Sequence, residues 1–75
     1  MENSLKKLRE QYELSQRDLA QQVDVTRQTI NAIERDRYNP SAELMFKLAH
    51  FFECQVEDVF HPDIEAETTI SEITT

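Results

Sequence analysis

Five polar side chains near the middle of the chain carry hydrogen-bond donors and acceptors suited to a planar or anionic partner. They are Thr26, Arg27, Gln28, Thr29 and Asn31. Arginine binds guanine through two parallel hydrogen bonds, and glutamine and asparagine bind adenine in the same way. This closely spaced set of residue types is suited to contacts with phosphates or base edges.

Two short amphipathic segments must position these residues. Ser15 is a good helix N-cap ahead of a segment over 16–22, and Thr26 is a second N-cap ahead of a segment over 27–34. Apolar residues recur at helical spacing in both segments, namely Leu19, Ala20, Val23, Ile30 and Ile33. The residues between the segments are too few for anything but a tight turn, so the two helices must cross at a large angle. This pattern predicts a helix-turn-helix, whose second helix enters the DNA major groove with its N-terminal residues leading.

Further motifs extend this pattern, and with them the chain resembles the phage-repressor and Cro (XRE-like) helix-turn-helix family over roughly Leu5 to Phe60. The motifs are Leu8-Arg9-Glu10, Leu14-Ser15-Gln16, Asp18-Leu19-Ala20, Val25-Thr26-Arg27-Gln28-Thr29-Ile30, Ile33-Glu34 and Asn39-Pro40-Ser41. The resemblance implies an all-α, five-helix phage-repressor-like domain. It also implies a stand-alone, sequence-specific DNA-binding transcriptional regulator.

The length of 75 residues is that of one small domain. We place the helix-turn-helix domain at 1–61 and an acidic C-terminal tail at 62–75. A first helix is expected over 5–12, with Asn3 or Ser4 as its cap. A fourth helix is expected to begin after its N-cap Ser41, and a fifth is expected over 56–60. The predicted core consists of Leu5, Leu8, Leu14, Leu19, Val23, Val25, Ile30, Ile33, Leu44, Leu48, Phe52, Val56 and Val59.

The resemblance assigns DNA contacts to residues on and around the second helix of the motif. The residues implied to contact bases are Arg27, Gln28 and Asn31, with Gln28 as the leading reader and Arg27 as either a base reader or a phosphate clamp. The residues implied to contact the DNA backbone are Gln16, Arg17, Thr26, Thr29, Arg35, Arg37, Tyr38 and Asn39. The alternative for these residues is a polar, solvated surface without a ligand.

Arg9 has a structural role in the resemblance. In the family an arginine at this position pairs with a glutamate at the end of the recognition helix, here Glu34. Such a pair would tie the first helix to the third. The alternative is a surface ion pair, which contributes only about 0–1 kcal/mol.

The net charge of −7 is unusual for a chain that binds DNA, because a basic patch is the usual footprint of such proteins. The charge is unevenly distributed. Residues 1–40 hold seven basic and seven acidic residues, whereas residues 41–75 hold one lysine and eight acidic residues. A molecule polarised in this way could dock through a neutral-to-basic face. Asp24 and Asp36 lie close to that face, so we expect modest non-specific affinity.

The chain contains no glycine, although helices commonly end with one residue in the left-handed conformation, which glycine adopts most easily. Asp24 stands in the turn of the helix-turn-helix, where members of the family often have glycine. Asparagine and aspartate are the next most tolerant residues. We therefore expect the turn to form, at some cost in stability.

The C-terminal third is expected to support a homodimer, since the fifth helix often contributes to a two-fold interface in the family. The candidate interface residues are Val59, Phe60, Ile70 and Ile73. The β-branched residues of 68–75 favour a strand, which would pair with its copy across a dimer axis or with an N-terminal segment. The acidic composition of 63–75 instead favours disorder, and a helical extension is a third alternative.

The function implied is binding of a homodimer to an inverted-repeat operator in double-stranded DNA, with repression by blocking polymerase as the simplest mechanism. Activation stays open. The alternative is an antitoxin or other protein-interaction module with the same fold, whose acidic tail binds a protein partner. No apolar run approaches the ~20 residues of a membrane span, and the N-terminus is polar. One cysteine fits a reducing cytoplasm.

Other chemistry finds little support in the residues. The chain has no recognisable Ser/His/Asp or Cys/His constellation and no glycine-rich phosphate loop, so an enzyme is not expected. His50, Cys54 and His61 do not complete a ligand set at any zinc spacing, so neither a metal nor a cofactor is expected. Cys54 is predicted to be a small, partly buried apolar residue.

Overall fold

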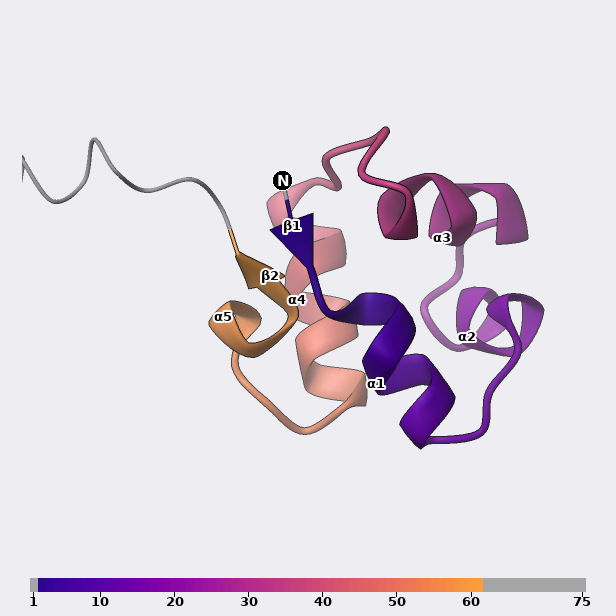
Figure 1. Cartoon of the computed structure of the whole chain (residues 1–75), viewed down its shortest axis with the longest axis horizontal. Coiled ribbons are helices and arrows are strands. Elements are labelled where there is room, and N and C mark those ends of the chain that lie inside the picture. Colours follow the sequence, from indigo (N-terminus) through magenta and orange to yellow (C-terminus); the bar gives the residue numbers. More distant parts are fainter. Residues whose placement is uncertain (1, 62–75) are drawn as a thin grey trace, which may run out of the picture.

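The structure, a computed structural model, describes residues 2–61 (Figure 1). Its elements in chain order are β1 (Glu2–Asn3), α1 (Leu5–Gln11), α2 (Gln16–Gln22), α3 (Arg27–Glu34), α4 (Ala42–Phe51), α5 (Val56–Val59) and β2 (Phe60–His61). α2 and α3 form one end of the domain, α4 and α5 form the other, and α1 lies between them (Figure 1). The expected five-helix architecture is confirmed.

The helices begin where hydroxyl side chains can bind the first unpaired backbone N–H groups. The side-chain oxygens of Ser15, Thr26 and Ser41 accept hydrogen bonds from the N–H groups of Asp18, Thr29 and Leu44, at 2.9, 3.2 and 3.2 Å. Asp18 completes a capping box, because its carboxylate accepts the N–H of Ser15 at 3.2 Å. Each cap contributes about 1 kcal/mol, so three of the four longer helices begin at positions that the local sequence encodes.

The first helix is capped by Asn3. Its side-chain oxygen accepts the N–H of Leu5 at 3.1 Å, and its amide nitrogen donates to the carbonyl of Ile33 at 2.8 Å. Ser4 occupies the N-cap position without a side-chain capping bond, and its hydroxyl instead bonds the His61 ring at 2.7 Å. One side chain therefore starts α1 and holds the start of the chain against the end of α3.

The fifth helix is one residue shorter than expected, because Phe60 leaves it for an extended conformation. Phe60 and His61 form β2, which pairs antiparallel with Asn3 and Glu2 of β1. His61 precedes a proline in the sequence, and a residue in that position is disfavoured in the α conformation. The N-terminal segment thus pairs with β2. The tail at 62–75, with its possible strand at 68–75, lies outside the described residues.

One apolar core is shared by all five helices. Its buried residues are Leu5, Leu19, Ala20, Val23, Ile30, Ile33, Leu44, Leu48, Ala49, Phe52, Val59 and Phe60. The predicted core omitted Ala20, Ala49 and Phe60. Four residues predicted for the core are only partly buried and pack against it, namely Leu8, Leu14, Val25 and Val56.

The first four helices each end in a residue with left-handed backbone geometry, and all four of these residues are acidic. They are Glu13, Asp24, Asp36 and Glu53, with φ of 56°, 60°, 58° and 54°. In each case the next residue donates its N–H back to a carbonyl in the last turn, as Val25 does to Ala20 at 2.9 Å and Cys54 to Ala49 at 3.0 Å. These bonds define Schellman motifs. The expected left-handed turn at Asp24 is one of four.

Replacing Glu53 with glycine should stabilise the domain. A left-handed conformation costs a residue with a Cβ atom about 1–2 kcal/mol, part of which returns as the greater freedom of glycine in the unfolded chain. The change also removes a negative charge from a helix C-terminus, where the helix dipole disfavours it. We expect Glu53→Gly to raise the free energy of unfolding by about 0.5–1 kcal/mol, seen as a melting temperature higher by roughly 2–8 °C.

The matched control is Glu10→Gly, the same substitution at an exposed position inside α1. It should lower the free energy of unfolding by about 1 kcal/mol, because glycine is a poor helix former. Thermal unfolding followed by circular dichroism measures both. A lower melting temperature for Glu53→Gly would contradict the assigned cost of the left-handed residue.

Candidate nucleic-acid interface

The turn between α2 and α3 sets the angle at which α3 is presented. α2 ends at its C-cap Val23, which is buried, and Asp24 turns the chain by adopting a positive φ of 60°. Thr26 then starts α3 as an exposed N-cap. Ile30 and Ile33 anchor α3 to the core, with 0% and 1% of their surface exposed. The opposite face of α3 is therefore directed away from the core.

That outer face of α3 carries the predicted base readers. Arg27 and Gln28 are exposed, and Asn31 is partly exposed. Thr29 is partly exposed, and its hydroxyl lies 3.0 Å from that of Thr26. The structure thus brings these side chains to one surface, with the two threonine hydroxyls adjacent at its N-terminal edge.

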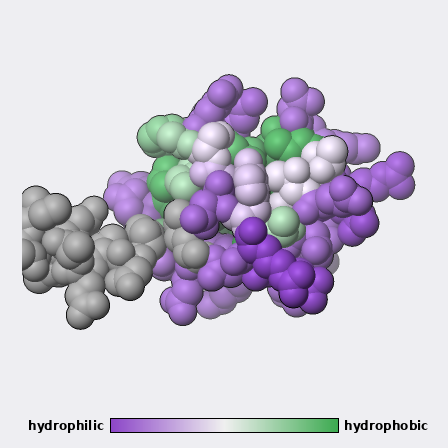
Figure 2. Space-filling view, turned by 90° about the horizontal axis from the view of Figure 1, so that it is seen from above, coloured by the Kyte–Doolittle hydropathy of each residue, from purple (hydrophilic) through white to green (hydrophobic). Residues whose placement is uncertain are grey.

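The loop after α3 adds the other predicted backbone contacts. Arg35, Arg37, Tyr38 and Asn39 are exposed in it. Tyr38 folds back towards α3, where it lines a shallow hollow of about 240 Å³ with Thr26, Gln28, Thr29 and Ala32. Figure 2 views the domain from the side of the loop between α3 and α4, and hydrophilic side chains cover most of this face. No short-range spacing in the sequence predicts that Tyr38 and Gln28 line the same hollow.

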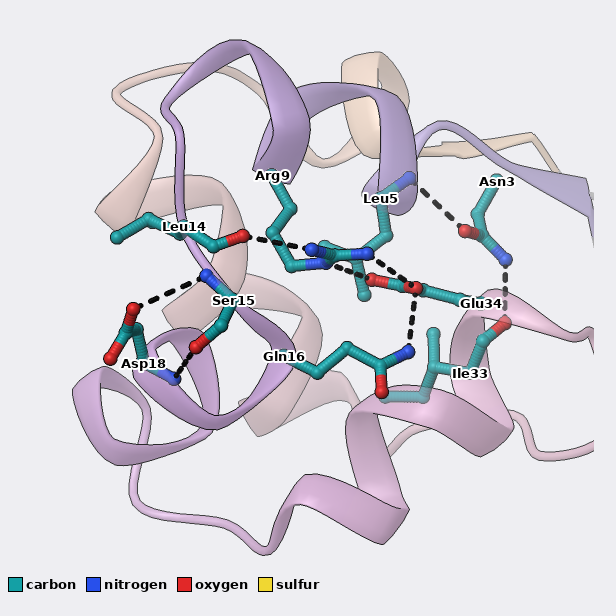
Figure 3. Close-up of polar contacts among 9 residues, drawn as sticks. All are labelled: Asn3, Leu5, Arg9, Leu14, Ser15, Gln16, Asp18, Ile33 and Glu34. Carbon is teal, nitrogen blue, oxygen red and sulfur yellow. Dashed lines mark hydrogen bonds and ion pairs between the residues drawn. The ribbon is translucent and has the colours of Figure 1, made fainter.

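A buried ion pair fixes the end of α3. The Nε atom of Arg9 lies 2.7 Å from Oε2 of Glu34, and its Nη2 atom lies 3.3 Å from Oε1 (Figure 3). Only 11% and 4% of the two side chains are exposed. Arg9 also donates from Nη1 to the carbonyl of Leu14 at 2.8 Å, just before α2 begins. The expected pair is present. Because its side chains are largely buried, it is not the exposed surface ion pair that was the alternative.

The ion pair changes the pKa of Arg9. Its hydrogen bond to Glu34 raises the pKa of Arg9 above the ordinary value, while partial burial acts in the opposite direction and is outweighed. Arg9 is therefore fully charged near neutral pH. The link between α1 and α3 is a bidentate, charge-assisted contact, which is the strong form of such bonds.

Gln16, predicted to contact the DNA backbone, has a second partner inside the domain. It is partly buried, and its Nε2 atom donates to Oε1 of Glu34 at 3.0 Å (Figure 3). Its neighbour Arg17 is exposed. Sequence reasoning missed the bond from Gln16 to Glu34 because the two residues are 18 positions apart and no short-range spacing relates them.

Val59 and Phe60, which were predicted to contact a second chain, are not exposed apolar side chains. Val59 is 0% exposed and Phe60 is 2% exposed within a single chain. Phe60 is buried because it leaves α5 and joins β2 beside β1. Ile70 and Ile73 lie outside the described residues. The large exposed apolar side chain at the α4–α5 end is Phe46, at 65% exposure among residues 2–61.

The remaining chemical groups do not gather into a second site within residues 2–61. Cys54 is partly buried as expected, and its pKa is raised by burial and by the nearby charge of Asp58, so it stays a thiol. His50 is exposed. No cluster of three metal-binding side chains occurs in this part of the chain. None of its helices has the length and apolar composition needed to cross a membrane.

Comparison with known proteins places this chain in a family. The profile of a helix-turn-helix family (HTH_3) matches residues 5–59. An uncharacterised HTH-type transcriptional regulator from Methanocaldococcus jannaschii is 50% identical over 60 residues, which cover 80% of this chain and 91% of the relative. A second such regulator, YgzD from Bacillus subtilis, is 45% identical over 60 residues, with the same coverage of 80% and 91%.

Solved structures agree at the level of the fold. The crystal structure of the clp gene regulator ClgR from Corynebacterium glutamicum superposes with a TM-score of 0.69 at 27% identity, covering 95% of this chain and 72% of that one. The SinR protein in its complex with SinI gives a TM-score of 0.69 at 23% identity, covering 95% of this chain and 75% of that one. The chain belongs to the helix-turn-helix family. It is a small DNA-binding transcriptional regulator of the XRE-like type, a class that is not enzymatic.

Removing the carboxylate of Glu34 should strongly destabilise the domain. Glu34→Ala leaves the guanidinium of Arg9 buried without its partner, which costs about 3 kcal/mol or more. For a domain of this size we expect the melting temperature to fall by roughly 10–20 °C.

Glu43→Ala is the matched control, since it removes the same side chain from an exposed pair on α4. Glu43 is 81% exposed and lies 3.7 Å from Lys47, so its loss should shift the melting temperature by no more than about 3 °C. Thermal unfolding of both variants checks the comparison. Equal changes in melting temperature for the two variants would show that the Arg9–Glu34 pair stabilises the domain no more than the exposed pair does.

Proposed function

We propose that this regulator acts in the cytoplasm as a repressor, binding an inverted-repeat operator as a homodimer with α3 in the major groove. The observation that carries the proposal is the division of α3 into two faces. Ile30 and Ile33 are buried, whereas Arg27 and Gln28 on the other face are exposed. A dimer occupying its operator can block polymerase without a further contact, so repression is the simplest outcome.

In this proposal the interface divides into reading and positioning residues. Gln28 is the leading base reader, because it projects from the first turn of α3, and a glutamine amide pairs bidentately with adenine. Arg27 and Asn31 are the other base contacts. The residues that bind phosphates and set the register are Gln16, Arg17, Thr26, Thr29, Arg35, Arg37, Tyr38 and Asn39.

The homodimer needs an apolar surface that a single chain leaves exposed. Phe46, Ala49, Cys54 and Val56 contribute to a hollow of about 850 Å³ between α4 and α5, which we call the α4–α5 hollow. The helices that line it lie at the end of the domain away from α2 and α3 (Figure 1). Pairing of two chains through this hollow leaves both copies of α3 free for half-sites about one helical turn, or ~34–36 Å, apart.

Selection of bound duplexes from a random pool tests the function directly. At low salt and over a range of protein concentrations, we expect recovery of a palindromic motif that is bound cooperatively. Recovery of no motif at any concentration would overturn the proposal, and the antitoxin or protein-interaction reading would then take its place.

Gln28→Ala and Arg37→Ala should differ in kind. Loss of Gln28 removes a base contact, so discrimination between the selected operator and a scrambled duplex should fall by ~1–3 kcal/mol. Loss of Arg37 removes a phosphate contact, so binding to both duplexes should weaken evenly, and the slope of log K against log salt should flatten by about one unit. Fluorescence anisotropy at several salt concentrations measures both. Identical behaviour of the two variants on both duplexes would refute the assigned roles.

Phe46→Ser should weaken dimerisation in the absence of DNA by about tenfold or more, because it removes a large apolar side chain from the proposed interface. Sedimentation velocity over a concentration series measures the association. Tyr38→Ser is the matched control, since Tyr38 is a 47% exposed aromatic residue in the loop after α3. The control should associate like the parent chain, and unchanged association of Phe46→Ser would rule out the α4–α5 hollow as the interface.

A further inference from the structure

The carboxylate of Glu34 binds two side chains that come from different helices. Oε2 accepts from Nε of Arg9 at 2.7 Å. Oε1 accepts from Nη2 of Arg9 at 3.3 Å and from Nε2 of Gln16 at 3.0 Å. Figure 3 shows the two donors converging on the carboxylate from α1 and from the start of α2. The side chain of Glu34 is only 4% exposed, so this carboxylate is held in place between the helices.

The bond to Glu34 determines which way the amide of Gln16 faces. A carboxylate only accepts hydrogen bonds, so the nitrogen of the amide, and not its oxygen, must face Glu34. The amide nitrogen carries two N–H groups, and within residues 2–61 only one of them is used. Gln16 is the first residue of α2 and is partly exposed. The bond to Glu34 therefore fixes the orientation of the second N–H as well, and the proposed function places a DNA phosphate beside this side chain.

We propose that Glu34 is a positioning residue for DNA backbone binding, which acts by holding the amide of Gln16 so that its second N–H donates to a phosphate. This inference rests on the proposed function. An unrestrained glutamine would have to lose side-chain freedom on binding, and the bond to Glu34 removes that freedom in advance. Arg9 is required as well, because it neutralises a carboxylate that would otherwise repel the phosphate.

In this arrangement Glu34 holds Gln16 because its carboxylate accepts a hydrogen bond, and not because it is charged. A neutral amide at position 34 should therefore hold Gln16 equally well, provided that Arg9 is also replaced so that no charge is left buried alone. The matched pair of proteins is Arg9→Met/Glu34→Gln and Arg9→Met/Glu34→Met. Both lack the ion pair and have side chains of similar length at position 34, but only the first keeps an acceptor for Gln16.

The experiment measures binding of this pair to the selected operator and to a scrambled duplex, below the melting temperature of both proteins. We expect the methionine form to bind both duplexes about five- to tenfold more weakly than the glutamine form, because a Gln16 side chain without an acceptor must lose its freedom on binding. The salt slope should be the same for both, because a neutral amide displaces no counterion. In a Gln16→Ala background the difference between the two forms should disappear.

Each other outcome overturns the positioning role. Equal affinity of the glutamine and methionine forms would mean that the acceptor does not matter. A difference that persists in the Gln16→Ala background would mean that Glu34 acts on DNA by another route. If Gln16→Ala binds like the parent chain while Gln28→Ala loses discrimination, the positioning role fails and the proposed function stands. If no variant, and not even the parent chain, prefers the operator, both fail together.

Discussion

The ion pair between Arg9 and Glu34 joins the first helix to the last turn of the third in the interior of the domain. Arg9 also holds the carbonyl of Leu14, where the chain turns into α2. Three elements therefore meet at one guanidinium, and the orientation of α3 depends on all of them. In a chain of 75 residues, whose net stability is only about 4–11 kcal/mol, the loss of one partner of this pair would remove much of the total.

A second constraint comes from the lack of glycine. Four helices end in Schellman motifs, and each places an acidic residue at positive φ. In all four motifs the residue after the acid donates its N–H to a carbonyl in the last turn, so the turns form despite the unfavourable conformation. The cost is conformational and electrostatic at once, because each acid lies at the negative end of a helix dipole. The turn of the helix-turn-helix is therefore built from the same motif as the other helix ends.

The distribution of charge fits this arrangement of elements. The arginines at 17, 27, 35 and 37 come from α2, α3 and the loop that follows, while the helices at the opposite end are predominantly acidic. Residues 16–39 hold four arginines and four acidic residues, so the end formed by α2 and α3 is neutral overall and the acidic excess lies in the second half of the chain. In the proposed function, the field of DNA favours approach of the neutral end over the acidic one. Wrong orientations are disfavoured by like-charge repulsion, which adds to specificity without any base contact.

Local patterns in the sequence determined the bounds of α2 and α3, the N-caps at Ser15, Thr26 and Ser41, and most of the core, because helix periodicity and capping act between residues three or four positions apart. The pairing of Arg9 with Glu34 came from the family resemblance. Only the tertiary structure decided that Gln16 binds Glu34, that Asn3 reaches Ile33, and that Val59 and Phe60 are buried in one chain. These contacts join residues 18, 30 and more positions apart. Local preferences act over a few residues, so they do not encode which distant segments pack together.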